Sequence, residues 1–156
     1  MVDQNCAYCV EGELLAKFGI KIAYTKLGIT FALIFVGIPF VARAVQPVLF
    51  KEQSHPGRCI VAHKKHVGDM NELTAEERAA YFEDVARVAR AIMKAFNPDK
   101  VNYGAYGDTG HHLHFHLCPK YKDEYEWGGV FLMNPDKKYL TDEEYADMIE
   151  KIKANL

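Results

Sequence analysis

The chain of 156 residues lacks several features that mark specialised classes of protein. Its 19 basic and 21 acidic residues nearly balance, with a formal net charge of −2, which argues against a protein that coats a nucleic acid backbone by charge alone. It contains no internal repeat and no linker rich in proline, glycine or serine. Because this length suits one domain of ordinary size, we expect one globular domain that holds a small ligand by local geometry.

Cysteines are few, and the N-terminus shows no basic segment followed by an apolar one, which a secretory signal requires. Without export disulfides are not expected, so the sequence predicts a cytoplasmic protein in which Cys6-Ala7-Tyr8-Cys9 indicates a metal half-site or a redox pair. A thioredoxin-type βαβ pattern is missing around this pair, which disfavours the redox interpretation. Cys59 and Cys118 lie in apolar strand patterns and are expected to be small buried hydrophobic residues.

Charge is also missing from the run between Leu27 and Ala42, in which Thr30 is the polar side chain. A membrane-spanning helix needs about 18–20 such residues, and this run is shorter and contains Pro39. Three interpretations stay open. The run is a buried helix that ends near Pro39, a pair of strands that turns at 37–39, or a membrane or interfacial segment.

Capping boxes mark the starts of two helices, Thr74 with Glu77 and Thr141 with Glu144. The first box opens an amphipathic stretch with one apolar stripe, which Asn97-Pro98 ends. Shorter patterns predict a helix over 11–18 and strands over 48–50, 58–62, 101–106 and 110–119. The sequence therefore predicts an α+β fold: an antiparallel sheet with one long helix and a C-terminal helix.

The strand predicted over 110–119 alternates histidine with apolar residues. In an extended strand His112, His114 and His116 share one face, while the apolar residues between them share the other. Three imidazoles without partners would be costly in a dry interior, so this face is expected to look into a polar cleft. The glycine-bearing loop before this strand can bring backbone N–H groups close to an anion, and polar side chains in and near the loop add donors and acceptors. The candidate substrate-binding residues are Asn102, Gly107, Asp108, Thr109 and Gly110.

Three further histidines are expected to play no part in chemistry. His111 points away from the face of the triad in a regular strand, and His55 and His63 are expected to be exposed at a turn and a strand end. The single tryptophan, Trp127, either stacks on a base, contacts a second subunit or packs on the core.

The segment His112-Leu-His114-Phe-His116-Leu-Cys118 resembles the signature of the histidine triad (HIT) family, in which histidines alternate with apolar residues. Asn102 before a glycine-bearing loop, Pro119, and the strand at 57–66 that ends in a basic pair and a histidine are also similar to the family pattern. The resemblance covers about residues 47–120. It implies one HIT-like domain over 1–156, with an unusual apolar insertion at about 24–46, and a homodimer.

The resemblance also implies a chemistry. HIT proteins include nucleotide hydrolases and transferases that act at the α-phosphate of nucleoside phosphoramidates and dinucleoside polyphosphates. By analogy His114 attacks phosphorus and forms a covalent nucleotidyl-histidine, while His116 and the amides of 107–110 stabilise charge on the phosphate oxygens. Asp108 or Thr109 assists the leaving group, and Asn102 contacts the α-phosphate or orients the loop. Preference for adenine is an inference from the family alone.

In part of the family, the bacterial type with an N-terminal CxxC motif, a zinc ion is bound; the corresponding ligands here are Cys6, Cys9, His66 and His112. A Cys₂His₂ set suits a closed tetrahedral zinc site, so the metal would be structural and would fix the triad strand. A membrane span at 27–42 would separate the cysteines from the histidines, so the zinc hypothesis disfavours that interpretation.

Two other functional hypotheses stay open. A non-catalytic module would bind purine nucleotides or zinc in the same cleft without turnover. A metal-dependent enzyme would use all three triad histidines as an open metal site, and it is disfavoured because the loop before the triad suits an anion.

Overall fold

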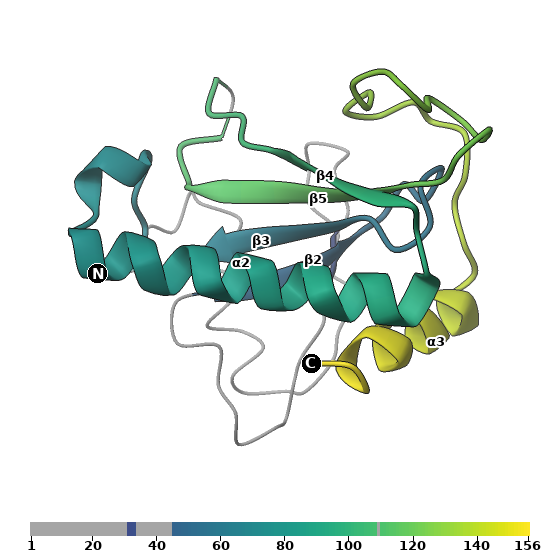
Figure 1. The fold of residues 1–156 in the computed structure, drawn as a ribbon, viewed down its shortest axis with the longest axis horizontal. Helices are drawn as coiled ribbons and strands as arrows, with labels where there is room; N and C mark the ends of the chain where they lie inside the picture. The colour runs from purple at the N-terminus through teal and green to yellow at the C-terminus, as the bar shows by residue number, and fades with distance from the viewer. Residues whose placement is uncertain (1–30, 34–44, 109) are drawn as a thin grey trace.

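The computed structural model describes residues 31–33, 45–108 and 110–156. In these ranges five antiparallel strands form one sheet in the order β1-β2-β3-β5-β4, and two helices accompany it (Figure 1). In chain order the elements are β1 (Phe31–Leu33), β2 (Val45–Phe50), β3 (Cys59–His63), the 3-10 helix η1 (Met70–Glu72), α2 (Ala75–Phe96), β4 (Lys100–Gly104), β5 (His114–Lys120) and α3 (Asp142–Lys153). The predicted α+β class, with an antiparallel sheet, one long helix and a C-terminal helix, is confirmed.

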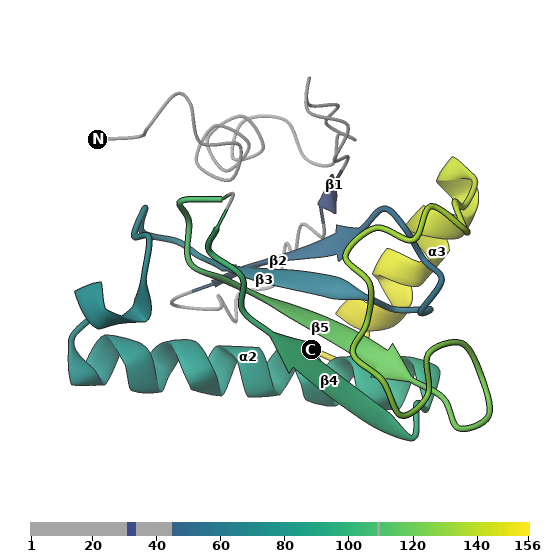
Figure 2. The same ribbon diagram turned by 90° about the horizontal axis from the view of Figure 1, so that it is seen from above.

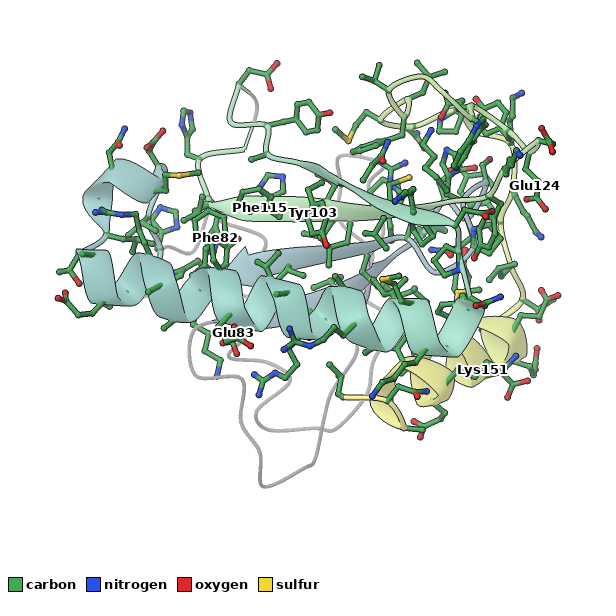
Figure 3. The ribbon with its side chains drawn as sticks, viewed as in Figure 1. Phe82, Glu83, Tyr103, Phe115, Glu124 and Lys151 are labelled. Atoms are coloured by element: carbon green, nitrogen blue, oxygen red, sulfur yellow. The ribbon has the colours of Figure 1, made fainter. Side chains whose placement is uncertain are left out.

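The long helix α2 begins and ends where its sequence signals lie. Thr74 and Glu77 form the capping box, and Asn97 ends the helix in the left-handed conformation with φ of 49°. Helix α2 lies along one face of the sheet (Figure 2), and its apolar stripe forms part of the core there. The side chains of Phe82 in α2 and Phe115 in β5 lie next to each other (Figure 3), and their ring centroids are 5.6 Å apart. This packing fixes which face of β5 is left for the histidines.

The C-terminal helix α3 lies beside the C-terminal end of α2 (Figure 1). Thr141 and Glu144 form its capping box. Tyr145 and Ile149 enter the core, and the Tyr145 hydroxyl donates a hydrogen bond of 2.5 Å to the carbonyl of Lys51. The helix is thereby anchored to the turn that follows β2.

The sheet has two chemically different faces. Residues that face α2 are apolar and form the core, among them Leu49, Val61 and Leu117. On β5 the alternate residues His114 and His116 point to the other face, as the two-residue period of a strand requires. This second face, called here the triad face, holds the candidate site.

Strand β5 is shorter than the sequence predicts. It begins at His114, and His112 lies in a bend before it. The chain bends there: Leu113 N–H donates to the carbonyl of Val67 at 2.7 Å, while the Leu113 carbonyl accepts from His63 N–H of β3 at 2.9 Å. The two strands on either side of the loop, β4 and β5, pair antiparallel, with Gly104 opposite His116, as expected for neighbouring strands of the predicted antiparallel sheet.

Within the apolar run, Phe31–Leu33 forms β1 and pairs with β2, so those three residues are strand and not helix. The rest of the run, the helix predicted over 11–18 and the pair Cys6 and Cys9 lie outside the described residues. Among the helices of the described ranges, none is both long and apolar enough to span a bilayer.

Candidate active site

The central histidine of the triad is presented as a nucleophile. His114 Nδ1 lies 2.7 Å from the carbonyl oxygen of His112. Since a carbonyl can only accept, this hydrogen bond assigns the proton to Nδ1 and the lone pair to Nε2. Burial lowers the pKa of His114 and outweighs the opposing effect of that hydrogen bond. The ring is therefore neutral at physiological pH, which is the form that can attack phosphorus.

The third histidine, His116, lies in a cage of rings. Its centroid is 5.7 Å from that of Phe50, 5.8 Å from Tyr106 and 6.2 Å from Phe131, and His114 lies 5.1 Å away. Burial lowers the pKa of His116 to about 3, with smaller contributions from His114 and Arg58. Its Nδ1 is buried and has no hydrogen-bond partner among the described residues. His116 is therefore neutral, and it can act as a hydrogen-bond donor but not as a cation.

The first histidine, His112, contacts the end of β3 and the residues that follow it. Its Nε2 donates a hydrogen bond of 2.6 Å to the carbonyl of His63, and its ring packs edge-on against His66 with centroids 5.4 Å apart. Two of the four predicted zinc ligands are thus side by side, while Cys6 and Cys9 lie outside the described residues. Among the residues that are described, no group of three or more histidine, cysteine or acidic side chains is placed to hold a metal ion.

The loop predicted to cradle phosphate lies beside His114. A Cβ atom built on Gly110 would be 3.9 Å from His114 Cε1, and the Gly110 carbonyl accepts a hydrogen bond of 2.7 Å from His112 N–H. Gly107 and Asp108 are exposed, and Thr109 lies outside the described residues. The loop therefore borders the nucleophile, with Gly107 and Asp108 open to solvent.

Asn102 lies on the triad face but away from His114. It pairs with Cys118, four residues along β5 from His114, which corresponds to about 13 Å at the rise of an extended strand. There it lines a cavity of about 300 Å³ together with Tyr106 and Phe131. The predicted contact between Asn102 and an α-phosphate at His114 would need a substrate that extends along the strand.

A buried polar network behind the site escaped the sequence analysis. His55, expected to be exposed, is 2% exposed, and its Nε2 lies 2.8 Å from Oε2 of Glu126. The same carboxylate accepts hydrogen bonds from Leu132 N–H, and Lys120 Nζ donates to the Glu126 carbonyl at 2.8 Å. This network holds the loop that brings Phe131 against His116. His55 and Glu126 are 71 residues apart, and no local pattern signals their pairing.

The expectation for His63 is also wrong. The side chain is 4% exposed, and its ring packs edge-on against that of Tyr81 with centroids 5.2 Å apart. Tyr81 in turn donates a hydrogen bond of 2.8 Å to the carbonyl of Val61. His63 is a core residue whose carbonyl positions His112, so it supports the triad without belonging to it.

We expect the protein to lose stability as the pH falls from 7.5 to 5.0. Burial lowers the pKa of five histidines in the folded state: His55, His63, His112, His114 and His116. The unfolded chain titrates near 6.5 and therefore binds more protons below that pH, so the free energy of unfolding decreases. Urea unfolding at several pH values measures this; a denaturation midpoint that is unchanged or higher at pH 5.0 contradicts the prediction.

Residues 48–123 match the family model described as the HIT domain. This segment of the chain has the sequence pattern of a HIT domain. It contains the triad, Arg58, His66 and the loop before β5, so the resemblance stated from the sequence is confirmed for that segment.

Solved structures support the fold. A histidine triad protein of Sinorhizobium meliloti is 24% identical with a TM-score of 0.67, covering 72% of this chain and 84% of that one. A hypothetical histidine triad nucleotide-binding protein of Sulfolobus tokodaii is 20% identical with a TM-score of 0.61, covering 80% and 83%. A Zn-bound histidine triad family protein of Mycobacterium smegmatis is 20% identical with a TM-score of 0.57, covering 78% and 84%. At these identities the likeness establishes the fold.

A second similarity involves a different kind of protein. Over 38 residues, 24% of this chain, the sequence is 66% identical to the sulfate transport system permease protein CysT of Escherichia coli. The chain spans 14% of the length of that permease. So short a match does not bring the activity of the permease to this chain.

Proposed function

We propose that the HIT domain of this protein is a nucleotidyl hydrolase or transferase that cleaves nucleoside phosphoramidates or dinucleoside polyphosphates at the α-phosphate. The observation that carries the proposal is the hydrogen bond from His114 Nδ1 to the His112 carbonyl, because it assigns the lone pair of a neutral imidazole to Nε2. Gly110, which lies beside His114, supports the proposal that the phosphate binds at this end of the loop.

In the first step, His114 Nε2 forms a bond to the α-phosphorus, and the bond from phosphorus to the leaving group breaks. The leaving group departs with the bonding electron pair and takes a proton, with Asp108 or Thr109 as the assisting group. The product is a nucleotidyl-histidine. In the second step water adds to phosphorus and gives up one proton, which restores the assisting group that protonated the leaving group. The P–N bond breaks, its electron pair returns to His114 Nε2, and the mononucleotide leaves.

Neutral hydrogen-bond donors stabilise the negative charge on the phosphate oxygens. His116 is one donor, and the backbone N–H groups of 107–110 are the others, as expected for a preorganised oxyanion site. A neutral donor is favoured over an imidazolium because burial lowers the pKa of His116 to about 3. Charge stabilisation of this kind does not change between pH 5 and pH 8.

The substrate is proposed to be an adenine nucleotide. The Sulfolobus tokodaii protein of the same fold is described as nucleotide-binding, which supports a nucleotide, while adenine rests on the family resemblance alone. Purified protein incubated with adenosine 5′-phosphoramidate or a diadenosine polyphosphate should release AMP, which chromatography and mass spectrometry detect. Tight AMP binding by calorimetry, without turnover of any member of the panel, would instead favour a non-catalytic binding module.

We also propose that a structural zinc ion is held by Cys6, Cys9, His66 and His112. Support comes from the contact between the His66 and His112 rings and from the donor set, which suits tetrahedral zinc. The Nε2 of His112 is engaged by the His63 carbonyl, so Nδ1 is the atom that would face the metal. Zinc would supply rigidity to the bend that carries His112.

Elemental analysis tests the zinc proposal. We expect about one zinc ion per chain in protein purified without chelator, and less than about a fifth of that in a Cys6→Ser, Cys9→Ser double variant. The matched control is Cys59→Ser, since Cys59 is buried in β3, away from the His66–His112 pair, and should leave the zinc content unchanged. Wild-type protein that folds and contains no zinc contradicts the proposal.

Homodimerisation in the cytoplasm completes the proposed function. Strand β4 is the edge strand of the described sheet next to β5, and its Tyr103 is exposed. The nearby Val130 is 82% exposed. An exposed strand edge with apolar neighbours is suited to pairing with a second copy. Light scattering should then give twice the mass of the 17.7 kDa chain.

A further inference from the structure

Arg58 is a fully buried cation next to the triad. Its Nη1 donates a hydrogen bond of 3.0 Å to the Leu132 carbonyl, and its Nη2 lies 3.5 Å from the sulfur of Met133. Its Nε is buried and has no partner among the described residues. A guanidinium retains its charge in proteins, so a positive charge is held here without a hydrogen-bonded carboxylate in the described part of the chain.

The arginine and the third histidine share their surroundings. The Arg58 guanidinium lies 4.1 Å from the ring centroid of Phe50 and 4.8 Å from that of Phe131. The same two rings pack against His116, at 5.7 and 6.2 Å. Arg58 directly precedes Cys59, which pairs with Leu117, so Arg58 is level with Cys118, the triad-face neighbour of His116. The two side chains are therefore neighbours on one face, between the same aromatic rings.

The unpaired atoms of the two groups are complementary. Nε of Arg58 can only donate, and Nδ1 of His116 can accept when it carries the lone pair. Both atoms are buried without partners among the described residues. An unpaired buried N–H is rarer in proteins than an unpaired acceptor, and a neighbouring cation repels an N–H dipole that points at it. Each argument assigns the lone pair of His116 to Nδ1.

We propose that Arg58 is a positioning residue, which holds His116 in the tautomer with the lone pair on Nδ1 and the proton on Nε2. The Nε2–H group then donates to a non-bridging oxygen of the substrate phosphate, while Arg58 itself stays out of contact with the substrate. This role rests on the proposed function and deepens it, because it explains how a neutral histidine is fixed as a donor. No proton is transferred in this role.

The direct test is the imidazole nitrogen spectrum of ¹⁵N-labelled protein at pH 7.5, which distinguishes the tautomers without any substrate. We expect His116 of the wild type to carry its proton on Nε2. Arg58→Met, which retains the length and loses the charge, should give a mixture of tautomers, and Arg58→Lys should retain the Nε2–H form. The matched control Arg90→Met removes an exposed arginine of α2 and should leave the spectrum unchanged.

Turnover gives a second readout. Arg58→Met should lower kcat on adenosine 5′-phosphoramidate by about 10²-fold with little change in KM, the loss typical of a weakened oxyanion donor, and Arg58→Lys should recover most of it. A wild-type His116 with its proton on Nδ1, or an unchanged tautomer in folded Arg58→Met, overturns the role of Arg58. If the tautomers behave as expected but the wild type turns over no substrate, it is the proposed function that fails. The wild-type spectrum decides the question even if Arg58→Met does not fold.

Discussion

His114→Ala should lower kcat/KM for release of AMP from adenosine 5′-phosphoramidate by at least about 10⁴-fold. The variant lacks the nitrogen that forms the covalent bond, and loss of a nucleophile typically costs this much or more because the remaining groups act only through it. The fold should survive, since the ring faces away from α2 and its Nδ1 donates a hydrogen bond to the nearby backbone carbonyl of His112, a contact between residues two apart in the chain. AMP release is followed by chromatography.

The neighbouring His111 provides the matched control. It is exposed and lies outside β5, so His111→Ala removes an imidazole three residues away and should retain activity within about threefold. Calorimetry on His114→Ala should still show AMP binding. If His114→Ala retains more than a tenth of the wild-type rate, His114 is not the nucleophile, and if its circular dichroism differs from that of the wild type the comparison is repeated with His114→Asn.

Glu126→Ala should lower the free energy of unfolding by about 2–3 kcal/mol, because it leaves the charge of Lys120 and the polar ring of His55 buried without their shared carboxylate. For a chain of this size, that corresponds to a melting temperature lower by roughly 5–10 °C. The size of this stabilising contribution also depends on pH. Partial burial acts to raise the pKa of Glu126, but hydrogen bonds from His55 and Leu132 outweigh it, so the pKa is lowered. The contribution is therefore present at neutral pH and is lost as the pH falls through the lowered pKa.

Glu83→Ala is the control for this stability effect. Glu83, labelled in Figure 3, lies on the side of α2 away from the sheet. It pairs with Arg90 at 2.8 Å, and both side chains are exposed. Exposed pairs contribute little, so the melting temperature should change by no more than about 1 °C. Equal effects of the two substitutions would show that the contacts between Glu126, His55 and Lys120 do not hold the loop. A secondary effect on activity is expected in Glu126→Ala because the same loop carries Phe131.

Local signals in the sequence predicted the frame of the domain well. The two capping boxes mark the starts of α2 and α3 to the residue, and the two-residue period correctly divides β5 between the core and the triad face. These features depend on neighbours within four residues, so they can be read from the chain directly. The predicted strand extended too far at its start because the bond from Leu113 to Val67 is non-local.

The surroundings of the site could not be predicted in the same way. Arg58 precedes a strand like many surface arginines, and its burial depends on Phe131 and Leu132, more than 70 residues later. From its sequence neighbours His55 has the appearance of an exposed turn residue. Its burial depends on a partner in a distant loop, Glu126, which those neighbours do not reveal. Polar groups are buried here because long-range contacts satisfy them, and such contacts leave no periodic pattern in the sequence.

The most direct test of the central claim is a search for a covalent nucleotide on His114. Wild-type protein mixed with excess adenosine 5′-phosphoramidate, quenched rapidly in alkaline denaturant and digested, should yield a peptide that contains residues 112–118 and carries one adenylyl group on His114. The same peptide from His114→Ala should be unmodified. Rapid AMP release with no modified peptide at any quench time, or with the group on another residue, would contradict the account.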